Sequence, residues 1–89
     1  MRINPDFTIQ QVGSSYVAVA VGETSRSFHG MIRLNETGAF LWKLLAEKDH
    51  TEEELVEAML STYEVDREIA ATDVHRILSV LGEHKIILQ

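Results

Sequence analysis

The residues of this chain whose types could support catalysis or metal binding are four histidines, a cluster of glutamates and six serines. The histidines form neither an HExxH motif nor a pair four residues apart: they are His29, His50, His75 and His84. Because structural metal sites depend on closely spaced ligands, we expect imidazoles that lie at the surface or are partly buried, without a metal. No serine lies in a nucleophile-elbow sequence.

The remaining reactive groups are excluded by residue type or by spacing. The chain has no cysteine, which excludes disulfides, thiolate metal ligands and cysteine catalysis. The five glycines lack the spacing of a phosphate-binding loop. The glutamates at 52–54 and 57 fit the first turn of a helix, where negative charge is favoured, better than an acid–base pair. We therefore expect no enzyme, no cofactor and no metal.

Length and charge restrict the class of protein and its partners. Eighty-nine residues predict a single domain over residues 1–89, and 45% hydrophobic with 25% charged residues is typical of globular chains. The net charge of −6 is concentrated in residues 47–68, with nine acidic and two basic residues. Nucleic acid is not expected as a partner, because its binding depends on Lys and Arg. No apolar run approaches the ~18 residues of a membrane span, and residues 1–6 lack the apolar segment of a signal peptide, so we expect a cytoplasmic protein with no membrane partner.

The first third of the chain is predicted to form strands. Residues 7–12 and 16–21 are rich in residues that favour strands, and Gly13-Ser14-Ser15 supplies a turn between them. A polar connection over 22–27 leads to a third strand over 28–34. Short connections between consecutive strands favour an antiparallel sheet.

The rest of the chain is predicted to form three helices. Asn35 is expected to cap the first, over 36–46, and Thr51 with Glu54 has the form of a capping box for the second. Asp66 is expected to cap the third. Trp42 lies one or two positions off the apolar stripe of the first helix and is expected to pack on the core, where it would cover the edge. The apolar stripes expected to be buried are Phe40, Leu41, Leu44 and Leu45 in the first helix, Leu55, Val56, Met59, Leu60 and Tyr63 in the second, and Ala70, Val74, Ile77, Leu78 and Leu81 in the third.

Three strands followed by three helices predict an α+β fold: a three-stranded antiparallel sheet beside helices in a winged helix-turn-helix-like arrangement. One face of the sheet is expected to cover the helices and the other to face water. The apolar tail Ile86–Leu88 is expected to be extended and to pack back on the domain.

The third helix carries a second feature beside its core stripe. Val80 lies about 100° from the centre of that stripe, beside Asp73 and Ile77, and Arg76 and His84 lie along its margin. An unpaired strand edge next to such a ridge forms a groove for an extended peptide, which adds as a strand. The alternative is that Val80 merely extends an ordinary core stripe.

The stretch LNETGAFLWKLL, within residues 31–45, is followed by TEEELVEAMLSTYEVDREIAATDVHRILSVL. Together these segments closely resemble the PqqD-like family. This is the pyrroloquinoline quinone synthesis protein D group, whose fold recurs as the precursor-peptide recognition element of ribosomal peptide biosynthesis. The resemblance runs from about Phe7 to Leu88, and its most specific part is Leu-Asn-Glu-Thr-Gly-x-x-x-Trp joined to the Asp73-Val74 helix.

The resemblance implies a domain that is not an enzyme. Such a domain captures the leader of a precursor peptide and presents it to a modifying enzyme, often a radical S-adenosylmethionine protein. The leader is expected to add to the edge of the third strand and to lie against the third helix. The residues that the resemblance assigns to peptide binding are Phe28, His29, Gly30, Met31, Ile32 and Arg33 on the strand, and Asp73, Arg76, Ile77, Val80 and His84 on the helix.

Their expected roles follow from residue type. Either the odd-numbered or the even-numbered residues of 28–33 direct their backbone groups to the leader, depending on register. Ile77 and Val80 are expected to receive apolar side chains, Arg33 and Arg76 carboxylates, and Asp73 a cation. The sequence names neither the precursor nor its pathway, which could be that of a quinone cofactor, a lasso peptide, a sactipeptide or another modified peptide.

Two other functions fit the predicted fold. A structural or oligomerisation module would pair the third strand with its own twin in a homodimer. A winged-helix transcription regulator would need a basic recognition helix, whereas the predicted second helix is strongly acidic.

Overall fold

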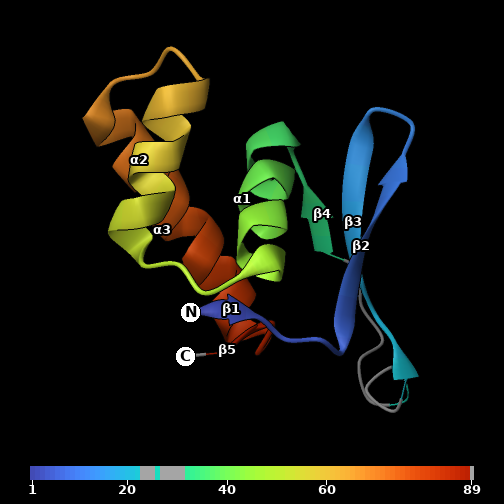
Figure 1. Cartoon of the computed structure of the whole chain (residues 1–89). Helices are drawn as coiled ribbons and strands as arrows, with labels where there is room; N and C mark the ends of the chain where they lie inside the picture. Colours follow the sequence, from blue (N-terminus) through green and yellow to red (C-terminus); the bar gives the residue numbers. More distant parts are fainter. Residues whose placement is uncertain (23–25, 27–31, 89) are drawn as a thin grey trace.

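The computed structural model describes residues 1–22, 26 and 32–88. Among these residues α1 lies between a sheet and the paired helices α2 and α3 (Figure 1). The elements are β1 (Arg2–Ile3), β2 (Phe7–Val12), β3 (Ser15–Ala20), β4 (Ile32–Leu34), α1 (Glu36–Glu47), α2 (Glu52–Thr62), α3 (Arg67–Glu83) and β5 (Ile87–Leu88). No helix within these described ranges is both long and apolar enough to cross a membrane.

The three-stranded antiparallel sheet has the order β2-β3-β4, which confirms the predicted α+β fold. Gly13 turns the β2–β3 hairpin with a φ of 64°, a conformation that side chains disfavour. The third strand begins at Ile32 in the described structure, and residues 28–31 of the predicted strand lie outside the described residues. On the sheet face toward the helices, Phe7, Ala18 and Leu34 are buried.

The opposite face of the sheet departs in one place from the expectation that it faces water. Gln10, Val12 and Arg33 are exposed on this face, as expected. Val17, in the central strand, is buried. The outer face is therefore exposed toward both edges and buried at its centre.

Side chains at the helix starts satisfy backbone N–H groups that have no partner within the helix. The Asn35 Oδ1 accepts from the Gly38 N–H at 2.8 Å, which confirms the predicted cap of α1. At α2 the Glu54 N–H donates to Thr51 Oγ1 at 3.1 Å, and the Thr51 N–H donates to Glu54 Oε1 at 2.8 Å, which completes the capping box. Asp66 does precede α3, but its side chain makes no capping hydrogen bond.

The core side of α1 differs from the prediction. Leu41, Trp42 and Leu45 are at most 2% exposed, whereas Phe40 and Leu44 are only half-buried. The reason is that α1 contacts β1 as well as β3 and β4, so its buried arc is turned toward Trp42. The Trp42 side chain therefore belongs to the core and not to its edge.

The two ends of the described chain pair in a small second sheet. β1 and β5 run antiparallel, with Arg2 opposite Leu88 and Ile3 opposite Ile87. Ile86 is fully buried and its carbonyl accepts from the Asn4 N–H at 2.7 Å. The expected packing of the apolar tail is confirmed, and its pairing with residues 2–3 was not predicted.

Candidate functional site

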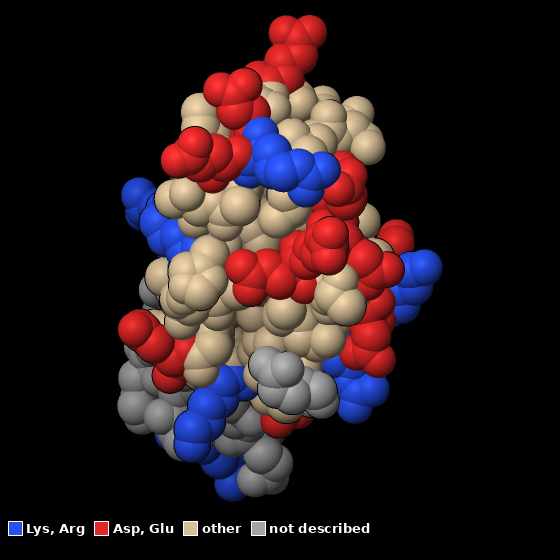
Figure 2. Space-filling view, turned by 90° about the vertical axis from the view of Figure 1, so that its left-hand side faces the viewer, with Lys and Arg blue, Asp and Glu red and all other residues tan. Residues whose placement is uncertain are grey.

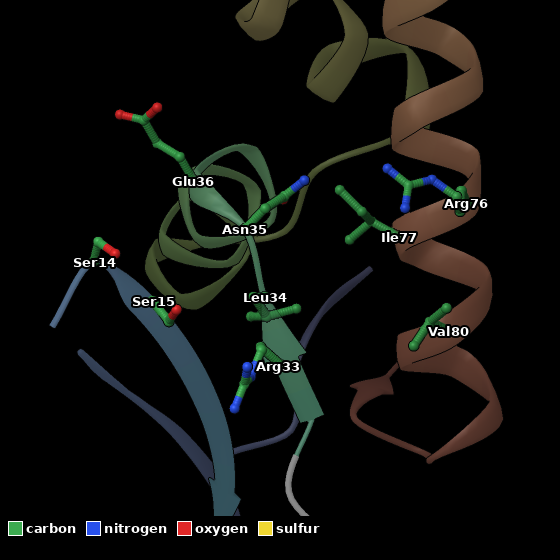
Figure 3. A pocket seen from close by; sticks show the side chains of 9 residues that line it. All are labelled: Ser14, Ser15, Arg33, Leu34, Asn35, Glu36, Arg76, Ile77 and Val80. Atoms are coloured by element: carbon green, nitrogen blue, oxygen red, sulfur yellow. The ribbon is translucent and has the colours of Figure 1, made fainter. Parts of the chain in front are cut away.

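A groove of about 520 Å³ lies between the edge of β4 and the side of α3. Figure 3 shows Ile77 and Val80 pointing from α3 toward β4, with Leu34 between the strand and the helix. The residues that line the groove are Ser14, Ser15, Arg33, Leu34, Asn35, Glu36, Arg76, Ile77 and Val80. One wall is thus a strand edge and the other is a helix.

The β2–β3 hairpin determines which backbone groups of β3 turn toward β4. The Val21 N–H donates to the Asp6 carbonyl at 2.8 Å, so these two residues form a hydrogen-bonded pair of the hairpin. In an antiparallel ladder such pairs recur at every second residue. In the β2–β3 register, Tyr16 and Ala18 alternate with the residues of β3 that are hydrogen-bonded to β2. Their backbone groups therefore point the other way, toward β4.

The same alternation directs the backbone of β4. Tyr16 lies opposite Leu34 and Ala18 opposite Ile32, so Ile32 and Leu34 use their N–H and C=O groups within the sheet. Arg33, which lies between them, directs its N–H and C=O away from β3, at the outer edge of the sheet. Among the described residues of this strand, Arg33 therefore presents the backbone groups to which another strand can bind.

The side chain of Arg33 lies on the sheet face opposite the helices. Successive side chains alternate across a strand, and Leu34 is the one that is buried toward the helices. Figure 3 shows the Arg33 side chain pointing away from α3. Within the described part of the chain, its guanidinium has neither an ion pair nor a hydrogen bond, and it is exposed. It is available to a carboxylate on the outer face of an added strand.

The two apolar residues of the α3 wall differ in burial. Ile77 is 6% exposed and packs in the core cluster, so it forms the floor of the groove. Val80 is 39% exposed and lies outside that cluster. The alternative that Val80 is an ordinary core residue is therefore wrong. It leaves apolar surface in the groove that a ligand can cover.

The charged residues predicted on α3 do not all reach the groove. Arg76 lines it, and its guanidinium lies 3.5 Å from the Asp73 carboxylate, one turn earlier on the same helix. Asp73 and His84 are not among the lining residues, and His84 lies at the C-terminal cap of α3. Among the described lining residues the charged ones are Arg33, Arg76 and Glu36, so this part of the groove is locally basic in a chain with a net charge of −6.

Several lining residues escaped the sequence prediction because they surround the start of α1. Asn35 and Glu36 follow β4 directly, so α1 begins where the groove ends. A Cβ at Gly38 would lie 3.2 Å from the Asn35 Oδ1 and 3.4 Å from the Leu34 side chain. The glycine of the LNETG stretch therefore allows the cap and the end of β4 to pack closely. The sequence signal for Asn35 and Glu36 was therefore the LNETG stretch itself, in which the cap residue and the glycine lie three positions apart.

The predicted strand residues are only partly described. Phe28, His29, Gly30 and Met31 lie outside the described residues. Ile32 is half-buried, pairs with Ala18 and is not a lining residue. The structure thus brings Arg33, Arg76, Ile77 and Val80 of the predicted set to one groove.

Groups with altered proton affinity lie away from this groove. Burial raises the pKa of the Tyr63 phenol, and the hydrogen bond from the Thr51 N–H lowers the pKa of Glu54. His75 and Glu52 approach to 3.4 Å between α3 and α2. No three His, Asp or Glu side chains of the described ranges are placed to hold one metal ion. What the groove offers a ligand is thus the outward backbone of Arg33, the apolar surface of Val80 and the guanidinium groups of Arg33 and Arg76.

Acidic side chains gather on the side of the molecule that α2 and α3 occupy (Figure 2). Those of α2 are exposed and include Glu52, Glu53, Glu54 and Glu57. A nucleic-acid phosphate would be repelled by this surface. The groove therefore favours a partner with negative charge, whereas the acidic surface favours one with positive charge.

Comparison with known proteins places the chain in a family. A comparison with curated protein sequences finds no significant match. The solved structure described as "Lasso peptide synthetase B1 complexed with the leader peptide" is similar with a TM-score of 0.75 and 25% identity, over 99% of this chain and 96% of that chain. "TbiB1 in Complex with the TbiA(beta) Leader Peptide" is similar in fold, with a TM-score of 0.73 and 24% identity, over 97% and 93% of the two chains. The model of the family described as coenzyme PQQ synthesis protein D (PqqD) matches residues 16–87, and the chain therefore belongs to the PqqD family.

Proposed function

We propose that this protein is a non-catalytic adaptor that binds the leader of a ribosomally made precursor peptide and presents it to a modifying enzyme, such as a radical S-adenosylmethionine protein. The observation that carries the proposal is the groove between the outward-facing edge of β4 and the apolar side of α3. The two solved chains of similar fold both hold a leader peptide. Membership of the PqqD family supports the same role.

The leader binds by strand addition at the edge of the third strand, over residues 28–33. Arg33 exchanges backbone hydrogen bonds with it, because its N–H and C=O face outward. Side chains of an added strand alternate between the two faces of the sheet. Those on the helix face enter the groove against Ile77 and Val80, and those on the outer face pass Arg33.

This alternation predicts the chemistry of the leader. A residue with an aliphatic or aromatic side chain enters the groove, and the adjacent residue in the leader, which points to the other face, carries a carboxylate for Arg33. Arg76 lies on the helix side and is already engaged by Asp73 at 3.5 Å. It accepts a second carboxylate less readily than Arg33. An acidic leader segment is therefore favoured, despite the negative charge of the chain as a whole.

The test is an amide NMR titration of labelled protein with the leader segment of the small peptide encoded nearest to its gene. A peptide of the same composition in scrambled order is the control. Strand addition in this groove shifts the amides of Ile32–Leu34 and Arg76–Val80. A leader that adds instead to the other edge of the sheet shifts Thr8–Gln11, which would contradict the proposed site. If leaders from several neighbouring genes leave every amide unmoved at millimolar concentration, the proposed function fails.

The charge of the leader is tested separately. Arg33→Glu reverses an exposed charge on the outer face and leaves the sheet hydrogen bonds in place. We expect it to weaken binding of an acidic leader by about tenfold and to restore part of the affinity for a leader whose acidic residue is changed to lysine. Lys43→Glu, on α1 and outside the groove, is the matched charge reversal and is expected to leave affinity unchanged. Equal losses for both variants would contradict a specific role for Arg33.

A further inference from the structure

The opposite edge of the sheet is also unpaired among the described residues. β2 is the outermost strand on that side, and its six residues, FTIQQV, include no charged residue and no proline. Natural edge strands are usually protected from pairing by lysine, proline, bulges or a covering element. None of the first three occurs in β2 as described. The edge is therefore chemically open to another strand.

Neighbouring elements leave room beside this edge. On the helix side of β2 a hollow of about 490 Å³ lies between the strand and α1, with Ile9, Trp42 and Ala46 in its lining. At the hairpin end of the strand, Val12 is 60% exposed. A strand added here would meet no obstruction from α1 and would cover Val12.

The hairpin geometry identifies the backbone groups that face outward. Asp6 is hydrogen-bonded to Val21, so Phe7, Ile9 and Gln11 direct their backbone groups away from β3. The Phe7 N–H already donates to the Asn4 carbonyl at 3.1 Å. This leaves Ile9 and Gln11 as the residues whose N–H and C=O are both directed to an added strand.

We propose that β2 pairs antiparallel with β2 of a second copy of this chain, around a two-fold axis at Gln10. In that register Ile9 of each copy lies opposite Gln11 of the other, and the two exchange both backbone hydrogen bonds. Pairing around Ile9 would instead require the Phe7 N–H, which is already used. Among the described residues of β2, the axis at Gln10 therefore uses the outward N–H groups of Ile9 and Gln11 and leaves the Phe7 N–H with its Asn4 partner.

The strand is self-complementary in this arrangement, which is the reason for choosing a second copy as the occupant. A two-fold axis at Gln10 places this residue opposite its own counterpart, so a charged residue there would repel itself. Gln10 at the axis is exposed and uncharged, and its amide can both donate and accept. Val12 of one copy lies beside Thr8 of the other and is covered by it.

The resulting dimer is a continuous six-stranded sheet with the order β4-β3-β2-β2-β3-β4. The contact is one strand wide, well below the area of a stable interface, so the dimer forms at high protein concentration and exchanges rapidly. The β4 edges lie at its two far ends and stay open. Self-association at β2 is thus compatible with the leader groove and does not depend on it.

The experiment is sedimentation of the wild-type chain and of two variants, from low micromolar to about 1 mM protein. Gln10→Lys and Gln10→Glu each place like charges opposite one another at the axis, and each is expected to weaken the dimer by about fivefold or more. An equimolar mixture of the two variants is expected to dimerise at least as well as wild type, because Lys then faces Glu. Ile69→Lys, at a 52% exposed position of α3, is the control and is expected to dimerise like wild type.

The outcomes separate clearly. Loss in each variant alone and recovery in the mixture support pairing of β2 around Gln10. A wild-type chain that stays monomeric at about 1 mM overturns the proposal. A dimer that neither Gln10 variant weakens also overturns it, because such a dimer would use another surface. A loss of dimer that mixing the two variants does not restore overturns it as well, because Gln10 would then not face its counterpart.

Discussion

Replacing Val80 by serine tests the α3 wall of the groove without disturbing the core. Val80 is 39% exposed and outside the core cluster, so the folded chain should tolerate a small polar side chain there. A leader that covers the remaining exposed part buries ~60 Å² of valine surface, which at about 25 cal/mol per Å² contributes ~1.5 kcal/mol. Val80→Ser should therefore raise the Kd of the leader by about tenfold.

The assay is calorimetric titration of the leader into each variant, with thermal unfolding to show that the fold is intact. Ile69→Ser is the matched control, since Ile69 is an aliphatic residue of the same helix, 52% exposed and outside the groove. It loses the same kind of surface and should bind like wild type. If Val80→Ser binds as tightly as Ile69→Ser, the apolar contact on α3 is absent and the assignment of this wall is wrong.

Further predictions concern the framework that holds the groove. Ile77→Glu should unfold the chain instead of blocking binding selectively, because it buries a charge at a 6% exposed core position; circular dichroism melting decides this. Trp42→Ala should destabilise by about 3–5 kcal/mol in urea unfolding. Thr51→Ala should cost about 1 kcal/mol in the same assay through loss of the α2 cap. The pKa of Glu54 is lowered in the folded chain, so its stabilising contribution is present above its unfolded pKa and is lost as the pH falls through its folded pKa; Glu54→Gln should flatten the acid limb of stability against pH.

Local sequence rules predicted the helix starts because each depends on only four consecutive residues. Asn35 caps α1 through the Gly38 N–H, and Thr51 and Glu54 close the box at α2. The order of the strands in the sheet was also predictable, because short connections leave few topologies. These features do not depend on what the rest of the chain does.

Features that depend on distant segments could not be predicted in the same way. Periodicity placed Phe40 and Leu44 in the core, whereas in the structure both are only half-buried and Trp42 is buried. The cause is the packing of β1 against α1, and β1 in turn pairs with β5 from the other end of the chain. Residues 2–3 are too short a strand to be recognised without that partner.

In the candidate site, too, some features follow from local sequence and others depend on distant segments. Helical geometry placed Val80 beside the core stripe and left open whether it extends that stripe, and its 39% exposure shows that it does not. The outward backbone of Arg33 was left open between two registers, and only the pairing of β4 with β3 settles it. Asp73 and His84 were placed on the correct helix, but the groove does not reach them.

Selectivity among leaders must come from side chains, because backbone pairing at the β4 edge is open to any extended segment. The groove residues fall into two groups by burial. Leu34 and Ile77 are buried in the core, so a change in either alters the shape of the groove and the stability of the fold together. Arg33, Arg76 and Val80 are exposed and are free to vary.

Substitutions that redirect the protein to a different leader should therefore lie in the exposed group. Exchanging those three residues for residues suited to a basic leader should reverse charge preference with little change in the unfolding midpoint; a large loss of stability would show that the two groups are not independent.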